Sequence, residues 1–170
     1  MKKILFILPV ILFLFAGCRQ GGGAAELRSY PITDMEGLIT KDGVELDQGT
    51  SSDGNGSLKV TAGGPVIIRL YETGDIDVED AILIYNAKVK TEGLEGTAFL
   101  EMWASFPGKG EFFSRDLETP VSGTTDWSSE MTPFFLKKGE NPDNVKLNLI
   151  VNGKGTVWVD DIKLAKGPLR

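Results

Sequence analysis

Apolar and polar residues alternate over short segments along most of the chain. In residues 144–151, valine and leucine occupy every second position, whereas Lys146 and Asn148 point to the opposite face, as in a strand that is buried on one side. No window keeps the i, i+3, i+4, i+7 spacing of an amphipathic helix. The other predicted strands are 57–62, 65–71, 81–90, 96–106, 111–115, 127–136 and 155–164. Strands at this spacing, with glycine-rich turns between them, predict an all-β chain folded as an antiparallel β-sandwich.

The predicted strand 155–164 changes register in its middle. The valines before Asp160 and the pair Ile162 and Leu164 after Asp161 are one step out of phase, and such a step turns side chains to the other face of a sheet. A β-bulge at the two aspartates restores the phase. One carboxylate then points outward, and the other lies at the sheet edge, where it needs a partner or a cation.

Two glycines separate the predicted strands 57–62 and 65–71. A two-residue turn made of Gly63 and Gly64 is typical of a β-hairpin. We therefore expect these two strands to pair with each other.

The N-terminus has the plan of a secretory signal peptide. Two lysines precede an apolar run that ends at Ala16, and this run is shorter than the roughly 20 residues of a membrane-spanning helix. The small residues before Cys18 resemble a bacterial lipoprotein box, which implies removal of residues 1–17 and a lipid on Cys18. The alternative is an ordinary cleaved signal with a free thiol, but a lone exposed cysteine is a liability in an oxidising compartment.

The segment after Cys18 predicts how the folded part is attached. Residues 18–26 contain three consecutive glycines and no hydrophobic pattern, so we expect a flexible tether. Residues 27–170 are then a single β-sandwich domain. Arg19 stands where inner-membrane lipoproteins of Gram-negative bacteria carry aspartate, which favours anchoring in the outer membrane of the cell envelope over the inner membrane.

The composition excludes several classes of function. The formal charge is −6, and removal of residues 1–17 leaves 16 basic and 24 acidic residues, which argues against nucleic acid as a partner. The chain has no histidine and one cysteine, so the usual hydrolytic triads, zinc sites and thiol nucleophiles are excluded. Pairs of carboxylates remain for a glycoside hydrolase, but acidic residues also gather at strand ends in any acidic β protein.

Four short motifs occur in the order and at the spacing of a known group of proteins. They are Thr33–Gly37, Ser52–Val60, Thr125–Trp127 and Gly155–Ile162. In these motifs the chain resembles jelly-roll carbohydrate-binding modules of the galactose-binding-like superfamily. The resemblance covers nearly all of the chain after the tether, and it implies a jelly roll, a carbohydrate ligand and no catalytic machinery.

The resemblance also implies one structural calcium ion. In such modules a glutamate of the first strand and an aspartate of the last commonly hold the ion, and the matching positions are Glu36 and Asp161. Calcium needs 6 to 8 oxygen ligands, so backbone carbonyls or water would supply the others. Alternatively, both carboxylates are only solvated at strand ends.

One predicted strand pair offers a ligand-binding face. In residues 96–106, Phe99, Glu101 and Trp103 point away from the buried series. A hairpin centred on Gly108 sets Trp103 opposite Phe113 and Glu101 opposite Arg115. Sugar rings stack on exposed aromatic faces while charged groups bond their hydroxyls. Alternatively, such cross-strand pairs only stabilise the sheet, by about 0.2 to 1 kcal/mol each.

Together these observations predict a lipid-anchored, non-catalytic binding module of the bacterial cell envelope, with carbohydrate as its ligand. A structural envelope lipoprotein with a protein partner is the alternative, and a glycoside hydrolase is the more remote one. An exposed aromatic platform with polar neighbours favours sugar, whereas a broad apolar patch favours a protein partner.

Overall fold

The computed structural model describes residues 23–169, and in this part of the chain every regular element is a β-strand. The predicted lipid site Cys18 and the signal peptide lie outside the described residues. The strands are β1 (Ala25–Tyr30), β2 (Val44–Asp47), β3 (Ser57–Ala62), β4 (Val66–Gly74), β5 (Ala81–Phe106), β6 (Gly110–Arg115), β7 (Val121–Leu136) and β8 (Asn144–Pro168). All the pairings between them are antiparallel. The predicted all-β jelly-roll sandwich is confirmed.

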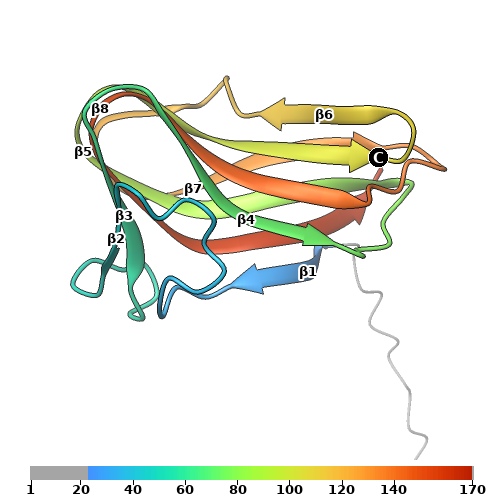
Figure 1. Ribbon diagram of the computed structural model, residues 1–170, viewed down its shortest axis with the longest axis horizontal. Helices are drawn as coiled ribbons and strands as arrows, with labels where there is room; N and C mark the ends of the chain where they lie inside the picture. Colours follow the sequence, from blue (N-terminus) through green and yellow to red (C-terminus); the bar gives the residue numbers. More distant parts are fainter. Residues whose placement is uncertain (1–22, 170) are drawn as a thin grey trace, which may run out of the picture.

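Two long strands run through both layers of the sandwich. β5 and β8 pair along almost their whole length, from Ala81 with Pro168 to Ser105 with Asn144, and both bend sharply at one end of the molecule (Figure 1). One layer holds the first half of β5 and the second half of β8, flanked by β7 on one side and by β1 and β3 on the other. The opposite layer has the strand order β4, β8, β5, β6.

Glycines make the bend possible. Gly96 of β5 faces Gly153 of β8, and a Cβ atom built on Gly96 would lie 2.2 Å from the carbonyl oxygen of Asn152. Real Cβ atoms do not approach a backbone oxygen so closely, so only glycine allows the two strands to touch here. The segments 81–90 and 96–106, which the sequence predicts as two strands, are therefore one bent strand.

The predicted hairpin at Gly63 and Gly64 is wrong. β3 and β4 are both antiparallel to β8, with Leu58 opposite Val159 and Val66 opposite Val151. Two strands that oppose the same neighbour run in the same direction, whereas a hairpin requires opposite directions. The segment with the two glycines thus carries the chain from β3 to β4 along the same edge of β8, without a reversal of the chain direction.

Two short strands were not predicted from the sequence. Most residues of β1 are exposed and β2 has only four residues, so neither shows a clear alternation. Ala25 and Glu26, at the end of the predicted tether, pair with Lys166 and Ala165 of β8.

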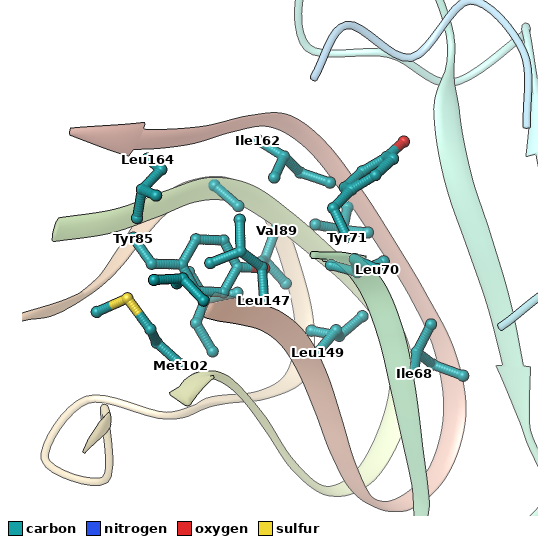
Figure 2. Packing of buried hydrophobic residues seen from close by; sticks show 14 of the residues in the cluster. Ile68, Leu70, Tyr71, Tyr85, Val89, Met102, Leu147, Leu149, Ile162 and Leu164 are labelled. Carbon is teal, nitrogen blue, oxygen red and sulfur yellow. The ribbon is translucent and has the colours of Figure 1, made fainter. Parts of the chain in front are cut away.

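The core lies between the two layers. Figure 2 shows side chains from β4, β5 and β8 meeting there, including Leu70, Tyr85 and Leu147. Ala98, Leu100, Met102 and Ala104 of β5 are fully buried on this side. Because side chains alternate along a strand, the residues between them are held on the outer face of the layer.

Candidate functional site

The outer face of the layer β4, β8, β5, β6 brings together side chains from all four strands. The register places Arg69 opposite Asn148, Asn148 opposite Glu101, and Glu101 opposite Arg115. We call these four residues the polar row. It crosses the whole layer, with a guanidinium at each end.

Glu101 is the centre of the polar row. Its side chain is only 2% exposed, and its carboxylate accepts hydrogen bonds from Arg115 Nε at 2.5 Å, Trp103 Nε1 at 2.7 Å and Asn148 Nδ2 at 3.0 Å. Burial of an ionised carboxylate is costly unless it is paired and hydrogen-bonded, and here both conditions are met. Glu101 therefore fixes the orientation of the Trp103 indole and of the Arg115 guanidinium.

An aromatic pair lies beside the polar row. Trp103 faces Phe113 across β5 and β6, with ring centroids 5.0 Å apart and planes tilted by 43°. The guanidinium of Arg115 lies over the Phe113 ring, 4.3 Å from its centroid. The predicted pairing of Trp103 with Phe113 and of Glu101 with Arg115 is confirmed.

Phe99 lies on the other side of the polar row. It is opposite Ile150, which is opposite Ile67, so these three residues form an apolar row. The structure thus places all five predicted ligand-binding residues on one face, but Phe99 is separated from the aromatic pair by the polar row.

Two shallow hollows open on this face. One has a volume of about 220 Å³ and extends across the polar row to Trp103 of the aromatic pair. The other has a volume of about 400 Å³ and lies over the apolar row. Ile67 and Arg115 line both hollows, so the two lie side by side. The first hollow is lined by Ile67, Arg69, Glu101, Trp103, Glu111, Arg115, Lys146 and Asn148.

The contribution of β4 and β8 to this face was not predicted from the sequence. The alternation in residues 144–151 already places Lys146 and Asn148 on an outer face, but it does not say which strands flank β8. Arg69 enters only because β4 pairs with β8. These assignments need the strand order, which no local pattern contains.

An ion pair closes the far end of the first hollow. Lys146 Nζ lies 2.5 Å from Glu111 Oε1, which also accepts a hydrogen bond from Ser105 Oγ at 2.8 Å. The hydrogen bond from Lys146, followed by that from Ser105, lowers the pKa of Glu111. This carboxylate is therefore held in its ionised form.

A second hollowed surface, lined by apolar and charged side chains alike, lies between the edges of β6 and β7. Exposed apolar side chains from the two strands and the connection between them line a groove with a volume of about 550 Å³. Ser114 Oγ lies 2.7 Å from Thr132 Oγ1 and donates to the Pro133 carbonyl at 2.5 Å, so the two edges touch at this point. We call this groove the apolar groove after the exposed large apolar residues that line it, which are Phe113, Leu117, Met131 and Phe135.

The predicted bulge in β8 is present. Asn86 pairs with Lys163 and Lys88 with Asp160, so β8 has one extra residue, and Asp161 has a positive φ of 49°. Asp160 is the buried carboxylate of the two. Its partners come from the loop before β3: it accepts hydrogen bonds from the Ser52 amide at 2.7 Å and from the Ser52 hydroxyl at 2.8 Å.

Asp161 points toward an ammonium group. Its Oδ1 lies 2.7 Å from Lys163 Nζ, so this oxygen already has a cationic partner. Glu36 lies in an exposed loop, and within residues 23–169 no group of three or more acidic or cysteine side chains is arranged to hold a metal. These side chains alone do not make a calcium site. Calcium at Glu36 and Asp161 stays a prediction, and a shift of the melting temperature on adding EDTA would support it.

The part of the chain that the structure describes contains no helix able to cross a membrane.

Solved structures with a similar fold include carbohydrate-binding modules. No protein-family model and no curated protein matches the sequence. Among solved structures, the CBM22-1 xylan-binding domain of a Paenibacillus barcinonensis protein is 15% identical, with a TM-score of 0.57 over 88% of this chain and 97% of that one. A family 16 carbohydrate-binding module is 13% identical, with a TM-score of 0.56 over 76% of this chain and 91% of that one.

An enzyme shares the same fold. A Stig cyclase of Fischerella sp. TAU, solved with an indole compound, is 13% identical, with a TM-score of 0.59 over 87% of this chain and 100% of that one. At these identities the similarity extends to the fold and not to an activity. The chain has the jelly-roll β-sandwich fold of carbohydrate-binding modules.

Proposed function

We propose that the outer face of the layer β4, β8, β5, β6 binds carbohydrate. The observation that carries this proposal is the fixed Trp103 indole, which a buried carboxylate orients at the edge of a hollow lined by polar side chains. A rigid aromatic ring beside fixed hydrogen-bonding groups is what an amphipathic sugar ring requires. The xylan-binding domain among the structural neighbours has the same fold, which adds support.

The charges of the hollow favour binding over hydrolysis. A glycoside hydrolase needs one carboxyl group with a raised pKa as general acid. Glu101 is paired with Arg115, and the pKa of Glu111 is lowered by Lys146. Glu111 therefore lacks the raised pKa of a general acid, and Glu101 is held in an ion pair, so we infer a non-catalytic module.

A glycan array probed with the purified chain tests the proposal. We expect one class of glycan to be retained, and we expect Trp103→Ala to lose that binding because the stacking ring is gone. A stacked aromatic contact contributes about 0.5 to 1.5 kcal/mol beyond its buried area, so the affinity should fall about tenfold or more. The melting temperature of the variant must match that of the wild type. Unchanged affinity in a folded variant would rule out this face as the site.

A protein partner is the second candidate function. The apolar groove supports it, because Leu117 and Phe135 are each more than 60% exposed and clustered exposed apolar side chains are typical of interaction sites. If the array retains no glycan and the substitution Phe135→Ser abolishes association with an envelope protein, this second function replaces the first.

We also propose that a lipid on Cys18 anchors the domain in the bacterial cell envelope, in the outer membrane. The support is the lipoprotein-like segment before Cys18, together with the start of the described fold soon after it, at β1. Stable anchoring requires more than one acyl chain, which bacterial lipoproteins carry.

The anchor is tested by labelling cells with palmitate. The wild-type chain should take up label and sediment with membranes, whereas Cys18→Ala should do neither. A wild-type chain without label would refute the lipoprotein assignment.

A further inference from the structure

The first hollow contains more positive than negative charge, although the chain as a whole is acidic. Its ionisable side chains are Arg69, Arg115 and Lys146 on one side and Glu101 and Glu111 on the other, in a protein of formal charge −6. The hollow therefore differs in the sign of its charge from the chain as a whole.

The pairing of these groups leaves one cation over. Glu101 is neutralised by Arg115, and Glu111 by Lys146, each at 2.5 Å. Within residues 23–169, the guanidinium of Arg69 has no ion-pair partner and no side-chain hydrogen bond. The backbone of Arg69, in contrast, is tied to Thr40 by a hydrogen bond of 3.1 Å, so the position of the residue is fixed while its charge stays available.

Arg69 has a defined place on the face. It ends the polar row beside Asn148, whose side chain is buried and donates to Glu101. The acidic residue of β4, Glu72, pairs in register with Lys146 and does not line the hollow. The charge of Arg69 also reaches into the hollow, because it adds to the effects of Lys146 and Ser105 in lowering the pKa of Glu111.

From this charge distribution we propose that the sugar bound in the first hollow is acidic, a uronic acid whose carboxylate is bound by the guanidinium of Arg69. This inference rests on the proposed function of the same face. Arginine presents two parallel N–H groups that match the two oxygens of a carboxylate. The Trp103 ring stacks on the sugar, and Arg69, at the opposite end of the hollow, selects the charged residue over the neutral one.

Pairs of ligands that differ only in their carboxyl groups separate the effect of the ligand's charge from the effect of its shape. The purified full chain is titrated with oligogalacturonate, oligomannuronate and a glucuronate-substituted xylo-oligosaccharide, each beside the same oligosaccharide after reduction of its carboxyl groups to alcohols. We expect the acidic form of at least one pair to bind about tenfold more tightly or better, since hydrogen bonds to charged groups contribute more than neutral ones. This preference should weaken as salt is added, because the guanidinium is exposed.

Two substitutions of Arg69 and one matched control complete the test. Arg69→Gln should bind the acidic and reduced forms equally, with its affinity for the reduced form unchanged, and Arg69→Lys should keep part of the preference. Arg28→Gln, which removes an exposed arginine of β1 outside the hollow, should behave as the wild type.

The outcomes distinguish a failure of the acidic specificity from a failure of the proposed carbohydrate binding. If an acidic ligand and its reduced form bind the wild type equally, or if Arg69→Gln weakens both to the same extent, the acidic specificity is refuted while carbohydrate binding stands. If no member of the panel and no glycan of the array binds, the proposed function itself fails.

Discussion

Replacing Gly96 with alanine is expected to destabilise the whole sandwich, because the added Cβ atom would meet the carbonyl oxygen of Asn152 at 2.2 Å and the Cα atom of Gly153 at 2.9 Å. Both are backbone atoms and cannot turn aside. Gly96 also has a φ of +126°, which other residues rarely adopt. The strands β5 and β8 would have to separate at the bend that joins the two layers.

The expected loss in the free energy of unfolding is about 3 kcal/mol or more, a large fraction of the stability of a typical domain. The melting temperature should fall by about 6 °C or more. Gly63→Ala is the matched control, since a Cβ atom at Gly63 meets no atom within 4 Å. Equal melting temperatures for the two variants would show that close contact at the bend is not essential.

The second large effect is expected from Glu101→Ala. This change removes the shared acceptor of Arg115, Trp103 and Asn148. The buried Asn148 amide would lose its hydrogen bond, whereas the partly exposed Arg115 could turn toward water. We expect the free energy of unfolding to fall by about 2 to 3 kcal/mol and the Trp103 indole to lose its fixed orientation, so that glycan affinity is also lost.

Glu111→Ala tests whether this effect is specific to the buried carboxylate. Glu111 lies on the same face and also pairs with a cation, but both partners are exposed to solvent, and such pairs contribute little. Denaturant unfolding should therefore show a much smaller change for Glu111→Ala. Equal losses for the two variants would mean that Glu101 is not the centre of the network.

The alternation of apolar and polar residues, with one turn, was enough to predict the pairing of Trp103 with Phe113. Alternation placed Trp103 outside the core, and a short turn at Gly108 fixed the register of β5 against β6, which the structure confirms. The bulge at Asp160 and Asp161 was predictable for the same reason, since a break in the apolar series must be repaired locally. Both features depend on residues that are close in the sequence.

Contacts between distant segments could not be predicted in this way. Gly63 and Gly64 are compatible with a tight turn or with a bend in a continuous edge, and only the pairing of β3 and β4 with β8 decides between them. The place of Arg69 beside Asn148 depends on the same strand order. Likewise, a serine partner of Asp160, Ser52, lies in a loop more than 100 residues away, so the sequence showed that a partner was needed but not which one.

The most direct test of carbohydrate binding at this face is the nuclear magnetic resonance signal of the tryptophan indole groups. The chain has three tryptophans, and Trp103 is the one on this face, whereas the Trp158 indole donates to Asp47 at 2.8 Å. During titration with the glycan that the array retains, the Trp103 signal, assigned with Trp103→Phe, should shift and saturate while the signals of Trp127 and Trp158 stay in place. A saturated complex in which the Trp103 signal has not moved would contradict the account.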